Sequence, residues 1–330
     1  MPRLAASQVI YAPMGCSPDG AAFLETASPS ELRKNALSSL AVSHDGYSAV
    51  NYSLDTISDL HDARLTSYFA TESEVLVLVN ATRDDALSTS KRVFVVPSTG
   101  ERFEQNIKSG THHDYLVTFD RQGNYKGAVE LDVPFKASKI AVFGSGQFLV
   151  IGSDSDHKTK VAFVNTDGSL QRFLDAEKPL LGSEKMMEAV GVLKKQSPEV
   201  QANPHPILGL AQIVSFQDKL LFTWSGMTWI LEITPGGSVR RVPIRVPPGL
   251  VIDHVIPSQE MWYIALRTYG ADSNQDQESA FYEVSPSNGT LTKRFETTPE
   301  YVSEIACEHD GEFRALLYDV NGQILLIGKP

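Results

Sequence analysis

The stretch IAVFGSGQFLVIGSDSDHKTKVAFVNTDGSLQRFL at 140–174 decides the fold. Its four apolar runs are separated by a Gly-Ser-Gly turn, a polar loop and an Asn-Thr-Asp-Gly turn, so it predicts four short strands in series. The Asp167-Gly168 pair supplies the positive φ that a tight hairpin turn requires. This unit is therefore typical of a four-stranded antiparallel sheet.

Two hairpins of this unit recur along the chain. The first-to-second hairpin appears at 15–25, 68–78, 141–151, 213–223, 255–265 and 306–316. The third-to-fourth hairpin appears at 40–54, 115–131, 161–174, 229–244 and 280–295. Such units in series predict an all-β fold, a six-bladed β-propeller with four antiparallel strands per blade, in which residues 1–330 form a single domain.

The two ends of the chain indicate how the ring closes. The last unit has three expected strands, at 303–308, 312–318 and 323–329, and then the chain stops. An additional apolar run, ASQVIYA at 6–12, precedes the first unit. Because a ring leaves exposed strand edges unless its last blade pairs with chain from the start, we expect residues 6–12 to form the outer strand of the last blade.

Composition and charge exclude several classes of protein. Hydrophobic residues make up 42% and charged residues 21% of the chain, which is ordinary for a soluble globular protein. The formal net charge of −11 disfavours nucleic acid and anionic membranes as partners. No run reaches the ~18 apolar residues of a membrane span, so we expect no membrane insertion. No signal peptide is visible, which indicates a cytoplasmic protein, or a periplasmic or secreted one if a signal peptide has been removed.

The two cysteines occupy equivalent positions in the first and last units. Cys16 and Cys307 stand where other units have Phe69, Val142 or Val214, so we favour buried free thiols that act as small hydrophobic side chains. A disulfide across the closing blades is the alternative, and it requires the two Cα atoms to lie within ~7 Å.

Most of the extra length of the chain falls in one set of connections. The first-to-second and third-to-fourth turns are short, whereas insertions at about 82–114 and 175–206 lie on the opposite face, here called the long-loop face. Long loops on one face of a rigid scaffold usually mark a binding face. Within them we expect a small β-excursion over 87–94 and 100–103 and a short helix over 183–195.

Polar side chains on the expected inner strands are the candidates for ligand binding at the mouth of the central channel. They are Arg64, Lys139, Gln212, Asp253, His254 and Glu304, with Ser67 and Ser303 beside them. A water-filled channel with satisfied polar groups is the alternative interpretation. Histidines and carboxylates near the same mouth could hold a divalent metal ion, although no ligand spacing such as HExxH is present. The metal candidates are His112, His113, His157, His205, Asp253 and His254.

The strand pattern resembles the six-bladed propellers of the NHL and gluconolactonase/regucalcin type, within the TolB-like group. The resemblance covers nearly the whole chain and is carried by its Asp-Gly turns and by the segment 119–150, which is similar to uncharacterised bacterial propellers. Regucalcin-like lactonases hold a divalent ion in the channel through Glu, Asn and Asp side chains. Only Asp253 matches that set, because the first unit opens with Met14-Gly15-Cys16 and the third and fourth inner strands carry no Asn.

No catalytic constellation is evident in the sequence. The chain has no Gly-rich phosphate loop and no GxSxG motif, and Gly144-Ser145-Gly146 is a turn. We therefore favour a binding or scaffold propeller that recognises a peptide, protein or small ligand through its long-loop face. The alternative is a metal-assisted hydrolase or lactonase with its site at the channel mouth. A homodimer built through the two insertions is a third hypothesis, and the sequence leaves the oligomeric state open.

Overall fold

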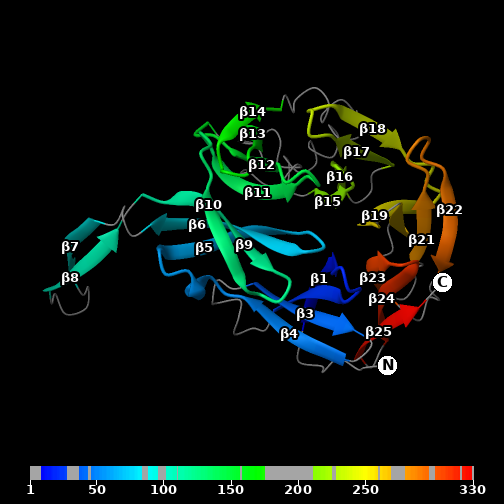
Figure 1. The fold of residues 1–330 in the computed structure, drawn as a ribbon, viewed down its shortest axis with the longest axis horizontal. Coiled ribbons are helices and arrows are strands. Elements are labelled where there is room, and N and C mark those ends of the chain that lie inside the picture. The colour runs from blue at the N-terminus through cyan, green and yellow to red at the C-terminus, as the bar shows by residue number, and fades with distance from the viewer. Residues whose placement is uncertain are drawn as a thin grey trace.

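Five four-stranded antiparallel sheets, arranged as blades around a ring, make up most of the structure, which is a computed structural model (Figure 1). The structure describes residues 9–27, 37–43, 46–83, 88–95, 102–109, 111–156, 158–174, 211–224, 228–258, 261–268, 279–296, 302–319 and 322–328. Within these ranges, no helix is long and apolar enough to cross a membrane.

In four blades the strands follow one another outward in chain order. Blade 1 contains β1 (Val9–Cys16), β2 (Ala22–Ala27), β3 (Leu37–Ser43) and β4 (Gly46–Tyr52). Blade 3 contains β11 (Lys136–Val142), β12 (Phe148–Ser153), β13 (Thr159–Val164) and β14 (Leu170–Phe173). Blade 4 contains β15 (Gln212–Phe216), β16 (Lys219–Thr223), β17 (Trp229–Ile233) and β18 (Val239–Pro243). Blade 5 contains β19 (Leu250–Pro257), β20 (Trp262–Thr268), β21 (Ser279–Val284) and β22 (Leu291–Glu296).

Blade 2 is interrupted by a hairpin. Its strands are β5 (Leu60–Ala70), β6 (Glu74–Arg83), β9 (His113–Asp120) and β10 (Tyr125–Glu130), and the short 3₁₀ helix η1 (Leu54–Thr56) precedes them. Between β6 and β9, β7 (Ser88–Val95) and β8 (Arg102–Ser109) pair only with each other and project away from the ring (Figure 1). The hairpin confirms the expected β-excursion, whereas the expected helix over 183–195 lies outside the described residues.

The prediction of six four-stranded blades is corrected to five. The remaining strands, β23 (Val302–His309), β24 (Glu312–Asp319) and β25 (Gly322–Gly328), form a three-stranded sheet in the described part of the chain. The first strand of this sheet contacts the first strands of blade 5 and blade 1, so the sheet lies between these two blades.

The strand expected to complete the last blade lies elsewhere. Residues 9–12 belong to β1 and pair with β2 of blade 1, whereas residues 6–8 lie outside the described residues. The expected strand stopped at Ala12, one residue before Pro13. β1 continues through Pro13 because a β-bulge between Pro13 and Gly15 accommodates a residue without an N–H donor.

The core lies between the blades. In β6, Val75, Val77 and Val79 pack into the apolar cluster shared with blade 1, whereas Leu76 and Leu78 pack into the cluster shared with blades 3 and 4. Successive side chains of a strand point to opposite faces, and here both faces are covered. This explains why the strand is a continuous apolar run rather than an alternating one.

Glycines in the third-to-fourth turns let one blade approach the next closely. Gly168 of blade 3 has φ +86°, and a Cβ atom there would clash with the backbone carbonyl of Glu130 in blade 2. Its own carbonyl accepts a hydrogen bond from the Asp132 N–H at 2.9 Å. Gly289 of blade 5 is packed against the carbonyl of Pro243 in blade 4 in the same way. These turns therefore need glycine both for its positive φ and for its lack of a side chain.

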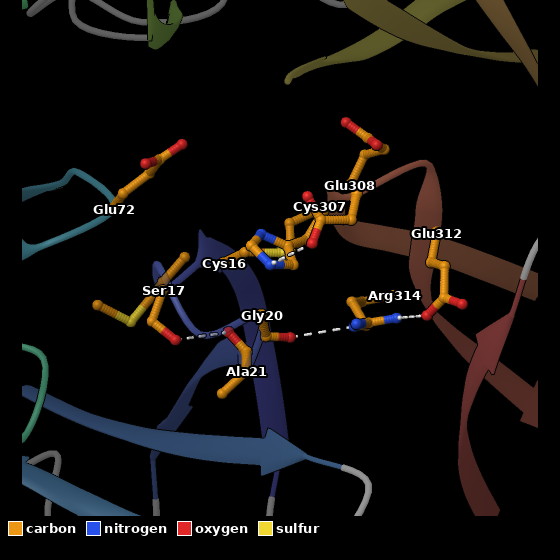
Figure 2. The surroundings of a disulfide bond; sticks show 12 residues. Cys16, Ser17, Gly20, Ala21, Glu72, Cys307, Glu308, Glu312 and Arg314 are labelled. Atoms are coloured by element: carbon orange, nitrogen blue, oxygen red, sulfur yellow. Dashed lines mark hydrogen bonds and ion pairs between the residues drawn. A yellow bond between two sulfur atoms is a disulfide. The ribbon is translucent and has the colours of Figure 1, made fainter. Parts of the chain in front are cut away.

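A disulfide joins the two ends of the ring. Cys16 on β1 is bonded to Cys307 on β23, with Cα atoms 5.4 Å apart and a separation of 291 positions in sequence (Figure 2). The prediction of free thiols is therefore wrong. The two positions are buried as expected, but the first and last inner strands converge there within bonding distance. Beside the bond, Arg314 Nε donates to the Gly20 carbonyl at 3.0 Å, which adds a second link across the junction (Figure 2).

Candidate functional site

Most inner strands of the blades are irregular, and in two of them polar residues lie at the irregularity. Five of the six inner strands, β1, β5, β11, β19 and β23, contain a β-bulge, and only β15 is regular. In β11 and β19 the bulge lies at Ser138, which is exposed, and at Asp253, which is half-buried, and the next residues are Lys139 and His254. A bulge re-aims the side chains beside it, so these strands present polar groups that regular strands would not.

Four of the six predicted ligand-binding residues lie on the neighbouring inner strands of blades 3, 4 and 5. We call Lys139, Gln212, Asp253 and His254 the inner-strand polar arc. Lys139 Nζ donates to the carbonyl of Ala211 in blade 4, and burial lowers the pKa of this lysine. The link from blade 3 to blade 4 is therefore a partly buried ammonium group on a backbone carbonyl.

Gln212 continues the arc from blade 4 to blade 5. Its Nε2 donates to the Val255 carbonyl at 3.3 Å, and its Oε1 accepts from the Val255 N–H at 2.9 Å. The amide thus takes the place of a neighbouring strand for one residue of β19. This pairing holds His254, the residue before Val255, in a fixed place.

His254 and Asp253 form the polar end of the arc. His254 Nδ1 lies 3.0 Å from Asp253 Oδ2, and the histidine side chain is 14% exposed. His254 Nε2 is covered and has no hydrogen-bond partner among the described residues. A carboxylate on one ring nitrogen fixes the ring orientation and leaves the other nitrogen to bind a further group.

The other two ligand-binding candidates do not join the arc through any described contact. Arg64 is exposed on β5 opposite Asn80. Glu304 lies on β23 opposite Leu316, and only its backbone is described. Ser67, on the inner strand of blade 2, has a covered Oγ without a hydrogen-bond partner in the described chain.

The metal candidates are dispersed where the structure describes them. His112 is exposed before β9, and His113 Nδ1 lies 2.9 Å from Glu130 Oε1 in the outer part of blade 2. His157 and His205 lie outside the described residues. No group of three or more His, Cys, Asp or Glu side chains that could hold a metal ion is present in the described ranges. The metal site therefore stays a prediction.

A cavity that the sequence did not predict lies between blades 1 and 2. It has a volume of about 570 Å³, and its lining includes Ser17, Asp19, Phe23, Tyr47, Ser48 and Arg121. Arg121 is 2% exposed, and its guanidinium carbon lies 4.8 Å above the Phe23 ring centroid. In the sequence, Arg121 could have indicated this cavity, because it is charged where the equivalent turn positions of the next three blades hold the uncharged residues Thr166, Pro235 and Pro286.

Known proteins with similar folds give no family for this chain. No family model and no curated protein matches it. Among solved structures, a catalytically inactive virginiamycin B lyase from Staphylococcus aureus with quinupristin has 14% identity and a TM-score of 0.44, over 100% of this chain and 98% of that one. A protein of unknown function from Dyadobacter fermentans has 8% identity and a TM-score of 0.44, over 99% of each chain. An exo-1,5-alpha-L-arabinanase from a bovine ruminal metagenomic library has 8% identity and a TM-score of 0.33, over 99% of this chain and 95% of that one. These likenesses carry no argument about function, and membership of the NHL or regucalcin group stays a prediction.

Proposed function

We propose that the protein is a binding propeller that holds a small polar ligand, or the end of a peptide, at the inner-strand polar arc, with access from the long-loop face. The observation that carries this proposal is His254, whose Nδ1 is held by Asp253 and whose Nε2 has no partner in the described chain. A covered polar nitrogen without a hydrogen bond costs about 1–3 kcal/mol, which a ligand group would recover.

The composition of the arc favours a ligand with both donor and acceptor groups. Lys139 supplies a partly desolvated ammonium group, and Asp253 supplies a carboxylate whose side chain is 38% exposed. Such a mixture suits hydroxylated molecules or the charged termini of peptides better than an apolar ligand. Lys139 and Gln212 also link three blades, so the arc is held on rigid strands rather than on loops.

A stabilisation screen tests the proposal. Sugars, sugar acids, amino acids and dipeptides are each added to the protein, and the midpoint of thermal unfolding is measured. A ligand of the arc should raise the midpoint of the wild type and of His113→Ala, which removes an exposed histidine on the third strand of blade 2, but not that of His254→Ala. Compounds whose effect survives in His254→Ala, or a screen without any stabilising compound, would contradict the proposal.

A metal-assisted hydrolase is the second candidate, and the Asp253–His254 pair is the observation that favours it. A histidine oriented by a carboxylate is a common metal ligand or general base. Purified protein with stoichiometric Ca²⁺ or Zn²⁺, and metal-dependent stabilisation that is lost in Asp253→Asn, would favour the enzyme. Metal-free protein that gains no stability from either ion would count against it.

The disulfide supports a proposal about the compartment. Disulfides such as Cys16–Cys307 form and persist mainly in oxidising compartments, so we infer that the chain matures in one, such as a periplasm or the secretory route. Expression of the same chain in reducing and oxidising compartments tests this inference, because only the oxidising compartment should give protein without free thiols.

We also propose that the β23–β25 sheet is a sixth blade of the ring.

A further inference from the structure

We propose that the cavity between blades 1 and 2 binds a carboxylate group, with Arg121 as its cationic partner. This site is separate from the inner-strand polar arc and is built from different residues. The ligand class is a small organic acid or a larger molecule that presents one carboxylate.

The first step is that Arg121 is buried and donates no hydrogen bond to a carboxylate in the described part of the chain. Its Nη2 donates to the Met14 carbonyl at 2.9 Å and its Nε to the Glu72 carbonyl at 3.3 Å, and both acceptors are neutral. Nη1 is covered and has no hydrogen-bond partner among the residues that the structure describes. Burial lowers the pKa of Arg121 to about 10, against the opposing charge of Glu72, so the group is still a cation at neutral pH. A buried charge without a hydrogen-bonded counter-ion is costly, and an anion bonded to it would reduce that cost.

The second step is that the equivalent turns of other blades dock without an arginine. The turns of blades 3, 4 and 5 dock on their preceding blades with Thr166, Pro235 and Pro286 at the same position, none of which is charged. The close approach of blade 2 to blade 1 is made instead by Gly123, whose missing side chain leaves room for the Asn51 carbonyl. Arg121 is therefore particular to the turn of blade 2, where it both contacts blade 1 and lines the cavity.

The third step is that a second charged group in the cavity, Asp19, favours a singly charged ligand. Asp19 also lines the cavity, and its hydrogen bond with the Ser17 hydroxyl lowers its pKa, so it is a carboxylate at neutral pH. This second charge disfavours a dianion such as phosphate more than a singly charged carboxylate. Guanidinium groups match carboxylates geometrically, so the cavity suits a monoanion that can approach Arg121.

The experiment replaces chloride by acetate at constant ionic strength and measures both the thermal midpoint and saturation-transfer NMR of acetate. Acetate should stabilise the wild type in a saturable way. Arg121→Gln should weaken acetate binding about tenfold or more, and Asp19→Asn should strengthen it roughly twofold to fivefold. Phosphate should bind the wild type less well than acetate and should gain more from Asp19→Asn.

Two further variants keep the test decisive. Arg172→Gln is the matched control. Like Arg121, Arg172 lies over a phenylalanine ring, 4.4 Å from the Phe163 centroid, and donates to a backbone carbonyl, that of Pro235. Unlike Arg121, it does not line the cavity. This variant should leave acetate binding unchanged. Ser48→Trp fills the cavity from an exposed position on β4 and should abolish binding even if Arg121→Gln does not fold. The proposal is overturned if acetate and chloride act alike on the wild type, or if Ser48→Trp and Arg121→Gln bind acetate normally.

Discussion

Removal of the Cys16–Cys307 disulfide should destabilise the ring more than most single changes can. The bond joins residues 291 positions apart, so it closes a loop of nearly the whole chain. In the chain-entropy model, a loop of this length corresponds to about 19 cal/mol/K, or about 5.7 kcal/mol at 25 °C. Measured effects are often smaller than the model, so we expect a loss of about 3–6 kcal/mol in the free energy of unfolding.

The variant of choice is Cys16→Ala together with Cys307→Ala. Both side chains are buried, at 8% and 4% exposure, and serine would add the separate cost of a buried hydroxyl group. For a chain of 330 residues, an unfolding entropy of ~2.1 cal/mol/K per residue gives about 0.7 kcal/mol per degree. The thermal midpoint should therefore fall by about 4–9 °C.

Calorimetry and thiol titration together test this reasoning. Wild-type protein in denaturant should show no reactive thiol without reductant and two after reduction. Reductant should lower the wild-type midpoint to that of the double variant and should leave the variant itself unchanged. Two reactive thiols without reductant, or a double variant that melts with the wild type, would refute the argument that a covalent bond closes the ring.

Three further changes test the contacts between and within blades. Gly168→Ala should cost about 2 kcal/mol or more because of its positive φ and the close carbonyl of blade 2, whereas Gly127→Ala, with ordinary φ and open space, should be nearly neutral by chemical denaturation. Glu232→Gln should cost about 1–2 kcal/mol at pH 7. Burial raises the pKa of Glu232, but hydrogen bonds and charge from Arg240 outweigh it and lower the pKa below 4.5. This stability is present above pH 4.5 and is lost as the pH falls through the folded-state pKa, so urea denaturation should show wild type and variant converging in acid. Gln212→Ala should cost about 1–3 kcal/mol by the same assay, because it leaves a backbone N–H of blade 5 without its acceptor.

The strand pattern could be predicted because local chemistry determines it. Runs such as 140–151 combine an apolar strand, a glycine turn and a second apolar strand, and this information lies within a dozen residues. The polar arc could be predicted for a related reason. Lys139, Gln212 and His254 interrupt inner strands that are otherwise apolar, and a polar residue in such a strand needs a partner or a ligand.

What the sequence did not predict depends on distances between segments far apart in the chain. The pairing of Cys16 with Cys307 requires that the first and last inner strands converge to 5.4 Å, which no local pattern reports. The cavity beside Arg121 likewise depends on how the turn of blade 2 meets blade 1. The placement of residues 6–12 in the last blade is also wrong, because the chain from Val9 onward pairs within blade 1 and the strand passes through Pro13 beside a bulge.

The junction between the last sheet and blade 1 carries the covalent link of the ring. Blades 2, 3 and 4 share one continuous apolar cluster, so each of them is held by burial on both faces. Within the described side chains of β23–β25, only Phe313 joins a core cluster, and that cluster is small and faces blade 5. Toward blade 1, the described links are the disulfide and the hydrogen bond from Arg314 to the Gly20 carbonyl. A covalent bond lowers the entropy of the unfolded chain rather than adding contacts to the folded one, so it stabilises the closed ring whatever the apolar contacts at this junction. Its effect is large here because it joins two residues 291 positions apart and so closes a loop of nearly the whole chain.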